Sequence, residues 1–298
     1  MRPEAQATFE PRPPFDLDLT LAPLSSGPSL RHHDGATWRA SRTPDGPATV
    51  QLKQRGRSVE VSGWGPGAEW AVSHAPELCG QADDDTGFAP AHPLIKRLHH
   101  EIRGIRLPRT RSVFEAVVPA VILQQVTTEE AVNSYRHLVN ALGEPAPGPA
   151  PLTLPPSPQV LLRTPYWSFH RFGIERRRAE IIIRAARSAN RLEEIVAMDI
   201  AGAYQRMRAF PGIGPWTAAK VATVALGDPD AVPVGDYHLP HSIGYAFEGT
   251  PRSTDERMLE LLEPYRGHRA RVIRLITVAG IVAPRFGPRK PLRNFRSY

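Results

Sequence analysis

The sequence predicts an α+β fold: a small antiparallel sheet with one helix comes first, and a nearly all-helical domain follows. Up to Trp64, apolar residues alternate with polar ones, as in strands that bury one face. From Pro93 onward, apolar residues recur three and four positions apart, as in helices that bury one face. A chain of 298 residues can bury two cores of ordinary size without disulfides or metals.

Short alternating segments define the expected sheet. They are residues 15–21, 38–42, 48–52 and 58–64, and Pro44-Asp45-Gly46-Pro47 forms a turn between two of them. One helix over residues 66–79 is expected to pack against the sheet. The run Asp83-Asp84-Asp85 then indicates a solvated boundary.

Helical periodicity dominates the rest of the chain. It covers residues 113–142, 176–189, 201–208, 217–226, 236–247, 254–262 and 268–282. The proline-rich segment 143–158 is expected to be a stiff loop within this domain. The predicted organisation is a flexible tail (1–14), an accessory sheet domain (15–90), a helical domain (91–283) and a basic tail (284–298).

Charge is distributed unevenly along the chain. Residues 1–91 carry 8 basic and 12 acidic side chains, whereas residues 92–298 carry 29 and 18. Arginine grips phosphate with two hydrogen bonds, so an arginine-rich helical domain favours a polyanionic partner. A GC-rich genome that encodes arginine in place of lysine is the alternative explanation of the composition.

The cysteine content and the hydropathy limit the class of protein. A single cysteine, Cys79, excludes an internal disulfide and a four-cysteine iron-sulfur cluster within this chain. No stretch approaches the roughly 18 consecutive apolar residues of a membrane span, and the first residues lack a secretory signal. We therefore expect a soluble, cytoplasmic protein that does not interact with membranes.

The segment Phe210-Pro211-Gly212-Ile213-Gly214-Pro215-Trp216-Thr217 lies between two amphipathic helical patterns. Pro211 ends the first helix, the two glycines permit a tight hairpin, and Pro215 suits the first turn of the next helix. Backbone N–H groups exposed at such a hairpin can bind phosphate. A second helix and a short turn follow, and then Gly235-Asp236-Tyr237-His238.

This arrangement resembles the helix-hairpin-helix DNA glycosylases, in which a Pro-Gly-x-Gly hairpin precedes an aspartate by about 20 residues. The resemblance is strongest to bacterial 3-methyladenine DNA glycosylase II. It extends over roughly residues 91–283, and the N-terminal sheet resembles the accessory domain of that family. Matching segments are Arg106-Leu107-Pro108, Phe114-Glu115-Ala116, Leu123-Gln124-Gln125-Val126, residues 158–187 and Glu263-Pro264-Tyr265-Arg266.

The resemblance implies a monofunctional DNA glycosylase of base excision repair. Such an enzyme flips a damaged base, an alkylated purine in the first place, out of double-stranded DNA and hydrolyses its N-glycosidic bond. Asp236 would stabilise the positive charge that develops on the sugar. The position of the nucleophilic lysine in the bifunctional members is held here by Trp216, and the iron-sulfur cysteines are missing.

The resemblance also implies roles for individual residues. The base-pocket residues would be Trp216, Gln124, Lys220 and Arg271. The DNA-binding residues would be Gln125, Gly212, Ile213, Gly214, Thr217 and His238. The backbone carbonyls of Phe210 and Ile213 would hold a structural Na⁺ or K⁺. No other cofactor is expected, and the protein would act as a monomer at the nucleoid.

The sequence departs from the family at Lys220 and Arg271, where aromatic residues are expected. Two cations there would repel a cationic base, so neutral damaged bases stay open as substrates. Two other functions also stay open. One is a catalytically silent helix-hairpin-helix DNA-binding protein, and the other is a bifunctional glycosylase/lyase that uses Lys220.

Overall fold

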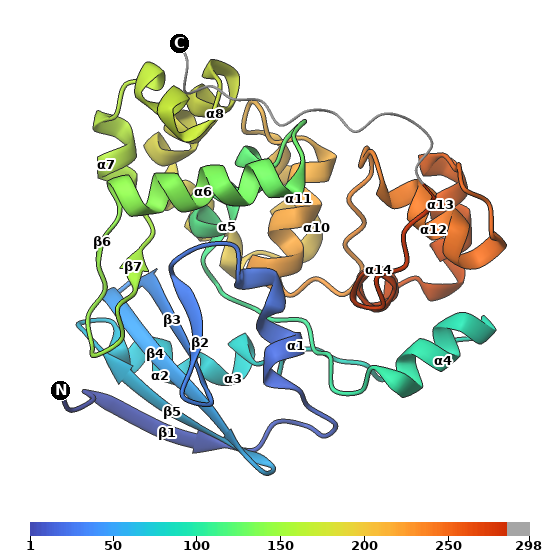
Figure 1. Cartoon of the computed structure of the whole chain (residues 1–298), viewed down its shortest axis with the longest axis horizontal. Helices are drawn as coiled ribbons and strands as arrows, with labels where there is room; N and C mark the ends of the chain where they lie inside the picture. The colour runs from blue at the N-terminus through green and yellow to red at the C-terminus, as the bar shows by residue number, and fades with distance from the viewer. Residues whose placement is uncertain (285–298) are drawn as a thin grey trace.

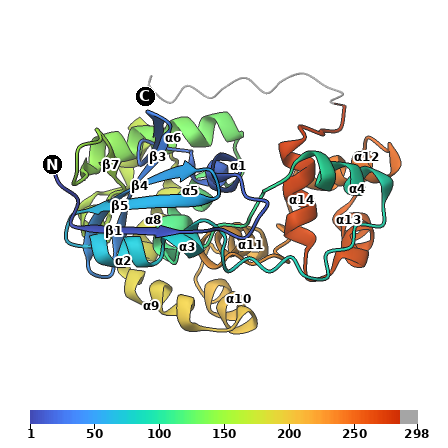
Figure 2. The same ribbon diagram turned by 90° about the horizontal axis from the view of Figure 1, so that it is seen from below.

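The computed structural model describes residues 1–284, so most of the predicted basic tail (284–298) lies outside the described residues. An antiparallel sheet occupies one end of the molecule, and helices form the rest (Figures 1 and 2). The strand order is β1-β5-β4-β3-β2. The strands are β1 (Ala5–Phe9), β2 (Leu30–His33), β3 (Ala36–Thr43), β4 (Gly46–Arg55) and β5 (Ser58–Trp64).

Both faces of the sheet are covered. Val50 and Leu52 of β4 pack in one apolar cluster with residues of the short helices α1 (Leu17–Leu21), α2 (Ala68–Ser73) and α3 (Ala75–Leu78). On the other face, Trp38 stacks on Trp64 with ring centroids 5.2 Å apart. The predicted stiff loop 143–158 covers these tryptophans with a small hairpin, β6 (Glu144–Pro145) and β7 (Thr153–Leu154).

The structure corrects the expected flexible tail at residues 1–14. Residues 5–9 form the edge strand β1, which pairs antiparallel with β5 from Ala5 opposite Gly63 to Phe9 opposite Val59. The alternation of this segment is weak, since its middle residues are exposed. Its place is set by backbone hydrogen bonds to β5 and by Ala5 and Phe9, which pack against the apolar cluster of the sheet.

Two further local expectations were wrong. Residues 15–21 were expected as a strand, but Asp16 accepts a hydrogen bond from the Leu19 N–H at 2.8 Å and caps helix α1. Leu17 and Leu21 are four residues apart, so a helix buries both of them on one face. The helix expected over 66–79 is two helices, because Pro76 has no N–H to continue the ladder of α2.

The helices bury two separate apolar clusters. The larger cluster contains residues of α5, α6 and α8 to α11, and the smaller one contains residues of α4, α12, α13 and α14. The bounds are α4 (Pro93–Glu101), α5 (Val113–Ile122), α6 (Thr128–Leu142), α7 (Pro158–Arg163), η2 (Tyr166–Phe172), α8 (Arg176–Arg187), α9 (Ala189–Glu193), η3 (Glu194–Ala197), α10 (Ile200–Arg208), α11 (Pro215–Val221), the π-helical η4 (Ala222–Leu226), α12 (Leu239–Glu248), α13 (Asp255–Leu262), η5 (Glu263–Tyr265) and α14 (Arg269–Val278); η1 (Ala22–Leu24) follows α1.

The smaller cluster defines a lobe whose helices come from two distant parts of the sequence, α4 and the segment from α12 to α14. Helix α4 precedes the larger cluster in sequence but lies beside α14 in both views (Figures 1 and 2). Ile95 and Leu98 of α4 pack there with Val272 and Leu275 of α14. Within residues 1–284, no helix is both long and apolar enough to cross a bilayer.

Candidate active site

The predicted hairpin lies between α10 and α11 and is anchored in the larger cluster. Ile213 is buried, and its N–H donates to the Phe210 carbonyl at 3.0 Å. Gly212 has a φ of 97°, and a Cβ added there would lie 2.5 Å from Ile181. Gly214 is exposed, and a Cβ added there would meet no atom within 4 Å. Gly212 is therefore required by the fold, and Gly214 is not.

Gln124 ties the end of α5 to this hairpin. Its side-chain amide donates to the Gly212 carbonyl at 3.0 Å and to the Thr217 hydroxyl at 2.8 Å. Thr217 is buried, with 2% of its surface exposed. The Thr217 side chain is buried and used by Gln124, so a contact of Thr217 with DNA through its backbone N–H stays a prediction. Gln124 positions the hairpin, and whether it also touches a base stays a prediction.

The neighbouring Gln125 has a different environment. Its side chain is exposed, and its φ of 58° lies in the left-handed region that residues other than glycine rarely adopt. Such a conformation costs about 1–3 kcal/mol and is concentrated at functional sites. The sharp turn after α5 therefore presents Gln125 to solvent next to the residue that holds the hairpin.

Asp236 lies just before α12 and is held by three hydrogen bonds. One carboxylate oxygen accepts the backbone N–H groups of His238 and Leu239, each at 2.9 Å. The other oxygen accepts the indole N–H of Trp216 at 2.8 Å. Trp216 was expected only as a pocket wall, and this hydrogen bond connects α11 directly to the carboxylate.

These contacts keep Asp236 ionised. Burial raises the pKa of its carboxyl group, but the hydrogen bonds from Trp216, His238 and Leu239 lower it, as does the Lys220 charge. The net result is a pKa below the usual value for an aspartate. A carboxylate of fixed position and permanent charge can stabilise a cation that forms next to it.

Lys220 lies one helical turn after Trp216 and is in the field of the same carboxylate. Burial lowers the pKa of Lys220, the Asp236 charge opposes this change, and the Arg274 charge adds to it. The lysine side chain nevertheless keeps an exposed surface. It is therefore surrounded by protein but accessible from solvent, beside Asp236. The expectation for Lys220 as a pocket residue stays a prediction.

Arg271 does not have the predicted environment. Only 4% of its surface is exposed, and its guanidinium donates two hydrogen bonds to Asp83, at 2.7 and 3.0 Å. Asp83 is fully buried, so the boundary at residues 83–85 is not solvated at its first position. Arg271 thus joins α14 to the segment before α4 through a buried ion pair. The expectation that it lines the base pocket is corrected accordingly.

Two residues near the site were missed by the sequence analysis. Arg274 of α14 affects the pKa of Lys220, and Tyr237, directly after Asp236, is 81% exposed. The Tyr237 ring lies edge-on to His238 with centroids 4.8 Å apart. Tyr237 could have been predicted as a site residue, because an aromatic residue directly follows the predicted catalytic aspartate. Arg274 carried no such signal, because its role depends on the packing of α14 against α11.

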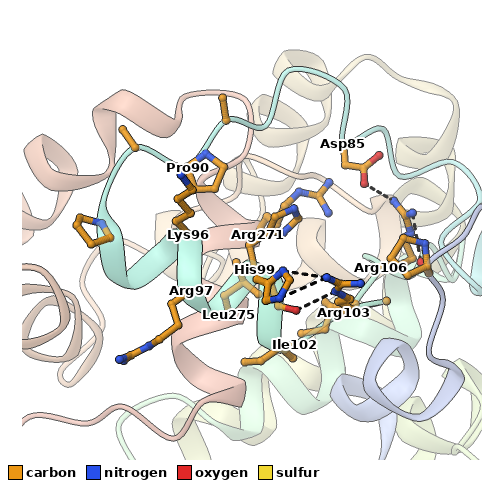
Figure 3. A pocket seen from close by; sticks show the side chains of 17 residues that line it. Asp85, Pro90, Lys96, Arg97, His99, Ile102, Arg103, Arg106, Arg271 and Leu275 are labelled. Carbon is orange, nitrogen blue, oxygen red and sulfur yellow. Dashed lines mark hydrogen bonds and ion pairs between the residues drawn. The ribbon is translucent and has the colours of Figure 1, made fainter.

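A cavity of about 1100 Å³ lies elsewhere, between α4 and the segments that flank it (Figure 3). Its lining includes Lys96, Arg97, His99 and Arg103 but neither Asp236 nor Trp216. Several of its cations are already paired, since Arg106 binds Asp85 at 2.7 Å and Arg271 binds Asp83. The candidate active site is therefore the Asp236 cluster.

Three curated relatives match part of the sequence. A Mycobacterium tuberculosis protein named probable bifunctional transcriptional activator/DNA repair enzyme AlkA is 33% identical over 156 residues, which cover 50% of this chain and 30% of that protein. The DNA-3-methyladenine glycosylase of Bacillus subtilis is 28% identical over 60% of this chain and 61% of its own. DNA-3-methyladenine glycosylase 2 of Escherichia coli is 29% identical over 55% of this chain and 58% of its own. The chain thus spans less than two thirds of the length of these relatives, and no protein-family model matches it.

Solved structures match nearly the whole chain. The 3-methyladenine DNA glycosylase of Archaeoglobus fulgidus has a TM-score of 0.75 at 21% identity, covering 91% of this chain and 97% of its own. The chain has the fold of the helix-hairpin-helix DNA glycosylases. The 8-oxoguanine glycosylase/lyase of Clostridium acetobutylicum shares this glycosylase fold with a TM-score of 0.72 at 14% identity, over 94% of this chain and 98% of its own. The predicted resemblance and the predicted α+β class are confirmed.

Proposed function

We propose that the protein is a DNA glycosylase of base excision repair that hydrolyses the N-glycosidic bond of damaged bases, with Asp236 as the catalytic carboxylate. The observation that carries this proposal is the ionised Asp236, fixed by Trp216 and by two backbone N–H groups beside the hairpin. The names of the relatives and the glycosylase fold support it. Alkylated purines are the substrates that these names suggest.

Double-stranded DNA is the proposed partner. The excess of basic over acidic residues beyond residue 91 attracts the phosphate backbone, and the exposed Gly214 allows close approach of a strand to the hairpin. A solved structure of this fold contains double-stranded DNA, which supports the same assignment. We expect the protein to act as a monomer at the nucleoid of the cytoplasm.

The chemistry follows from the charge of Asp236. Flipping a base out of the duplex costs a few kcal/mol, and a side chain that fills the gap offsets part of this cost. Gln125 is exposed at a sharp turn and suits this role. When the bond between the sugar and the base breaks, positive charge develops on the sugar, and Asp236 stabilises it most strongly in the transition state. Water then bonds to C1′.

The proposed reaction leaves the DNA strand intact. Trp216 has no amine, and its indole N–H is used to hold Asp236. Lys220 is displaced by one helical turn, about 5.4 Å along the axis, from the position that would attack the opened sugar. A glycosylase/lyase that uses Lys220 is the second candidate, favoured by the accessible and deprotonation-prone amine.

A structural Na⁺ or K⁺ at the hairpin remains part of the proposal. The Phe210 carbonyl accepts the Ile213 N–H at 3.0 Å and keeps a second lone pair. Carbonyl oxygens of this kind suit a monovalent cation, which would stiffen the hairpin. No iron-sulfur cluster and no other cofactor are proposed.

The test is a panel of duplexes that each contain one damaged base. Released base is measured first, and strand cleavage is then measured with and without alkali. We expect base release and strands that break only with alkali. Borohydride added during turnover should trap no protein-DNA adduct. An adduct that disappears in Lys220→Ala would establish the lyase instead, and binding without release from any duplex would indicate a silent DNA-binding protein.

A further inference from the structure

Two cationic side chains on different helices lie near one another at the candidate active site: Lys220 of α11 acts on Asp236, and Arg274 of α14 acts on Lys220. Lys220 follows Trp216 by one turn of α11 and so lies on the same face as the indole that holds Asp236. Ala219 of α11 and Ala270 of α14 belong to one small buried cluster, which Ala231 completes. Arg274 follows Ala270 by one turn, so it lies on the face of α14 that is turned toward α11.

The charges of these residues act on one another. The pKa of Lys220 responds to both Asp236 and Arg274, which places all three in one electrostatic cluster. The Arg274 guanidinium donates to the Leu19 carbonyl of α1, and in the described part of the chain its buried Nε has no partner. Lys220 keeps an exposed surface. Asp236 therefore acts on Lys220, Lys220 also lies in the field of Arg274, and the Asp236 carboxylate accepts hydrogen bonds from Trp216 and from the start of α12.

This charge balance affects which base can occupy the site. A purine alkylated at N7 or N3 carries a fixed positive charge, which the two cations repel. A neutral damaged base with a carbonyl oxygen offers an acceptor for the Lys220 ammonium group. Such a base is also the harder one to release, because it departs with negative charge, and a cation beside it stabilises that charge.

We propose that Lys220 and Arg274 make the site select neutral damaged bases that carry an acceptor over bases with a fixed positive charge, and that Lys220 donates a proton to the departing base; this inference rests on the proposed glycosylase function. The bond between C1′ and the base nitrogen breaks with its electron pair on the base, and the base takes a proton from Lys220 Nζ. Water bonds to C1′ and releases a proton, which restores the charge of Lys220 through solvent. Arg274 acts through Lys220 and is a positioning residue.

The experiment compares two duplexes of one sequence, containing either hypoxanthine, which is neutral and has a carbonyl oxygen, or 7-methylguanine, which carries a fixed charge. Single-turnover release is divided by the spontaneous release from the same duplex. The wild-type protein should show the larger rate enhancement on hypoxanthine. Its hypoxanthine rate should also fall at alkaline pH as Lys220 loses its proton, whereas the 7-methylguanine rate should not follow the charge of Lys220.

Substitution at Lys220 gives the decisive measurement. Lys220→Met should lower hypoxanthine release about 100-fold, the effect of losing one donor to a charge in the transition state, without lowering 7-methylguanine release. Lys220→Arg keeps the positive charge but cannot give up a proton, so it should also lower hypoxanthine release while still disfavouring 7-methylguanine. The matched control is Lys96→Met on α4, an exposed lysine outside the Asp236 cluster, which should change neither rate.

Two results would overturn the inference while leaving the proposed function standing. One is a larger wild-type enhancement on 7-methylguanine, and the other is an equal loss on both duplexes in Lys220→Met. Failure of the wild-type protein to release either base, or any base of the wider panel, would instead contradict the proposed function. Continued release of 7-methylguanine by Lys220→Met shows that this variant is folded.

Discussion

The negative charge of Asp236 is the feature of the candidate site on which the proposed chemistry depends. Asp236→Asn keeps one oxygen, which can accept either the His238 and Leu239 N–H groups or the Trp216 N–H, so it removes the charge together with one side of the hydrogen bonding. We expect single-turnover base release to fall about 1000-fold, because the charge acts mainly in the transition state. Affinity for a duplex with an uncleavable abasic analogue should stay within a few fold. Wild-type release rates in this variant would remove Asp236 from the catalytic role.

The hydrogen bond from Trp216 to Asp236 makes a separate prediction about pH. Burial raises the pKa of Asp236, and the Trp216 N–H is the first of the groups that bring it down. Trp216→Phe keeps an aromatic ring but removes this donor, so the pKa of Asp236 should rise. Because the ionised form is the active one, the acidic limb of the pH profile should move to higher pH. A profile with an unchanged acidic limb would mean that Trp216 serves only as a wall.

The role of a residue could be predicted from sequence where local motifs define it, and not where a distant partner does. Asp236 was assigned from its spacing to the hairpin, and the structure places it in contact with Trp216, while its catalytic role stays a prediction. Arg271 was misassigned because its partner, Asp83, lies 188 residues away in the chain. The hydrogen bond of Thr217 could not be predicted, because its partner, Gln124, lies 93 residues away in the turn after α5.

At the scale of elements, the two glycines of the hairpin differ: the fold requires Gly212 but not Gly214. Gly214→Ala should lower the free energy of unfolding by no more than about 1 kcal/mol, because its Cβ meets no atom within 4 Å and only the weaker N-cap preference of alanine opposes it. It should weaken binding to every duplex by a similar factor, since backbone contacts carry no sequence information. Urea unfolding and binding titrations measure the two effects. A loss confined to one damaged base would contradict the contact with phosphate.

Gly212→Ala is the matched comparison and should behave in the opposite way. Its Cβ would lie 2.5 Å from Ile181, and its φ of 97° is unfavourable for alanine. We expect about 1–3 kcal/mol lower stability in urea unfolding. Equal stability of the two variants would contradict the described hairpin geometry.

Element types followed from sequence more reliably than element ends. Strands β3, β4 and β5 were expected within a few residues of their bounds, because β-branched and aromatic residues alternate there. The apolar residues of segment 15–21 fit both the two-residue period of a strand and the four-residue spacing of a helix. The segment is a helix because Asp16 caps its first turn. β1 was missed although Ala5, Ala7 and Phe9 alternate with polar residues, because the run has only five residues and two of its apolar residues are small alanines.

At the scale of the whole molecule, the buried ion pair of Asp83 and Arg271 connects the segment before α4 to α14, near the end of the described chain. Asp83→Asn leaves the Arg271 charge buried without its counter-charge and should destabilise the fold by about 3–5 kcal/mol in urea unfolding. Asp84→Asn, at the exposed neighbouring position, is the control and should leave stability nearly unchanged. Equal effects of the two substitutions would mean that the pair is solvated.

The lobe formed by α4, α12, α13 and α14 has a consequence for how the protein is made. Its first helix leaves the ribosome long before its last one, so Ile95 and Leu98 are without their packing partners during most of synthesis. Contacts between such distant segments form slowly, and the apolar surfaces that wait for them are prone to aggregate. The lobe can therefore close only when nearly the whole chain has emerged, and a nascent or truncated chain that lacks α14 would leave the apolar face of α4 open to chaperones.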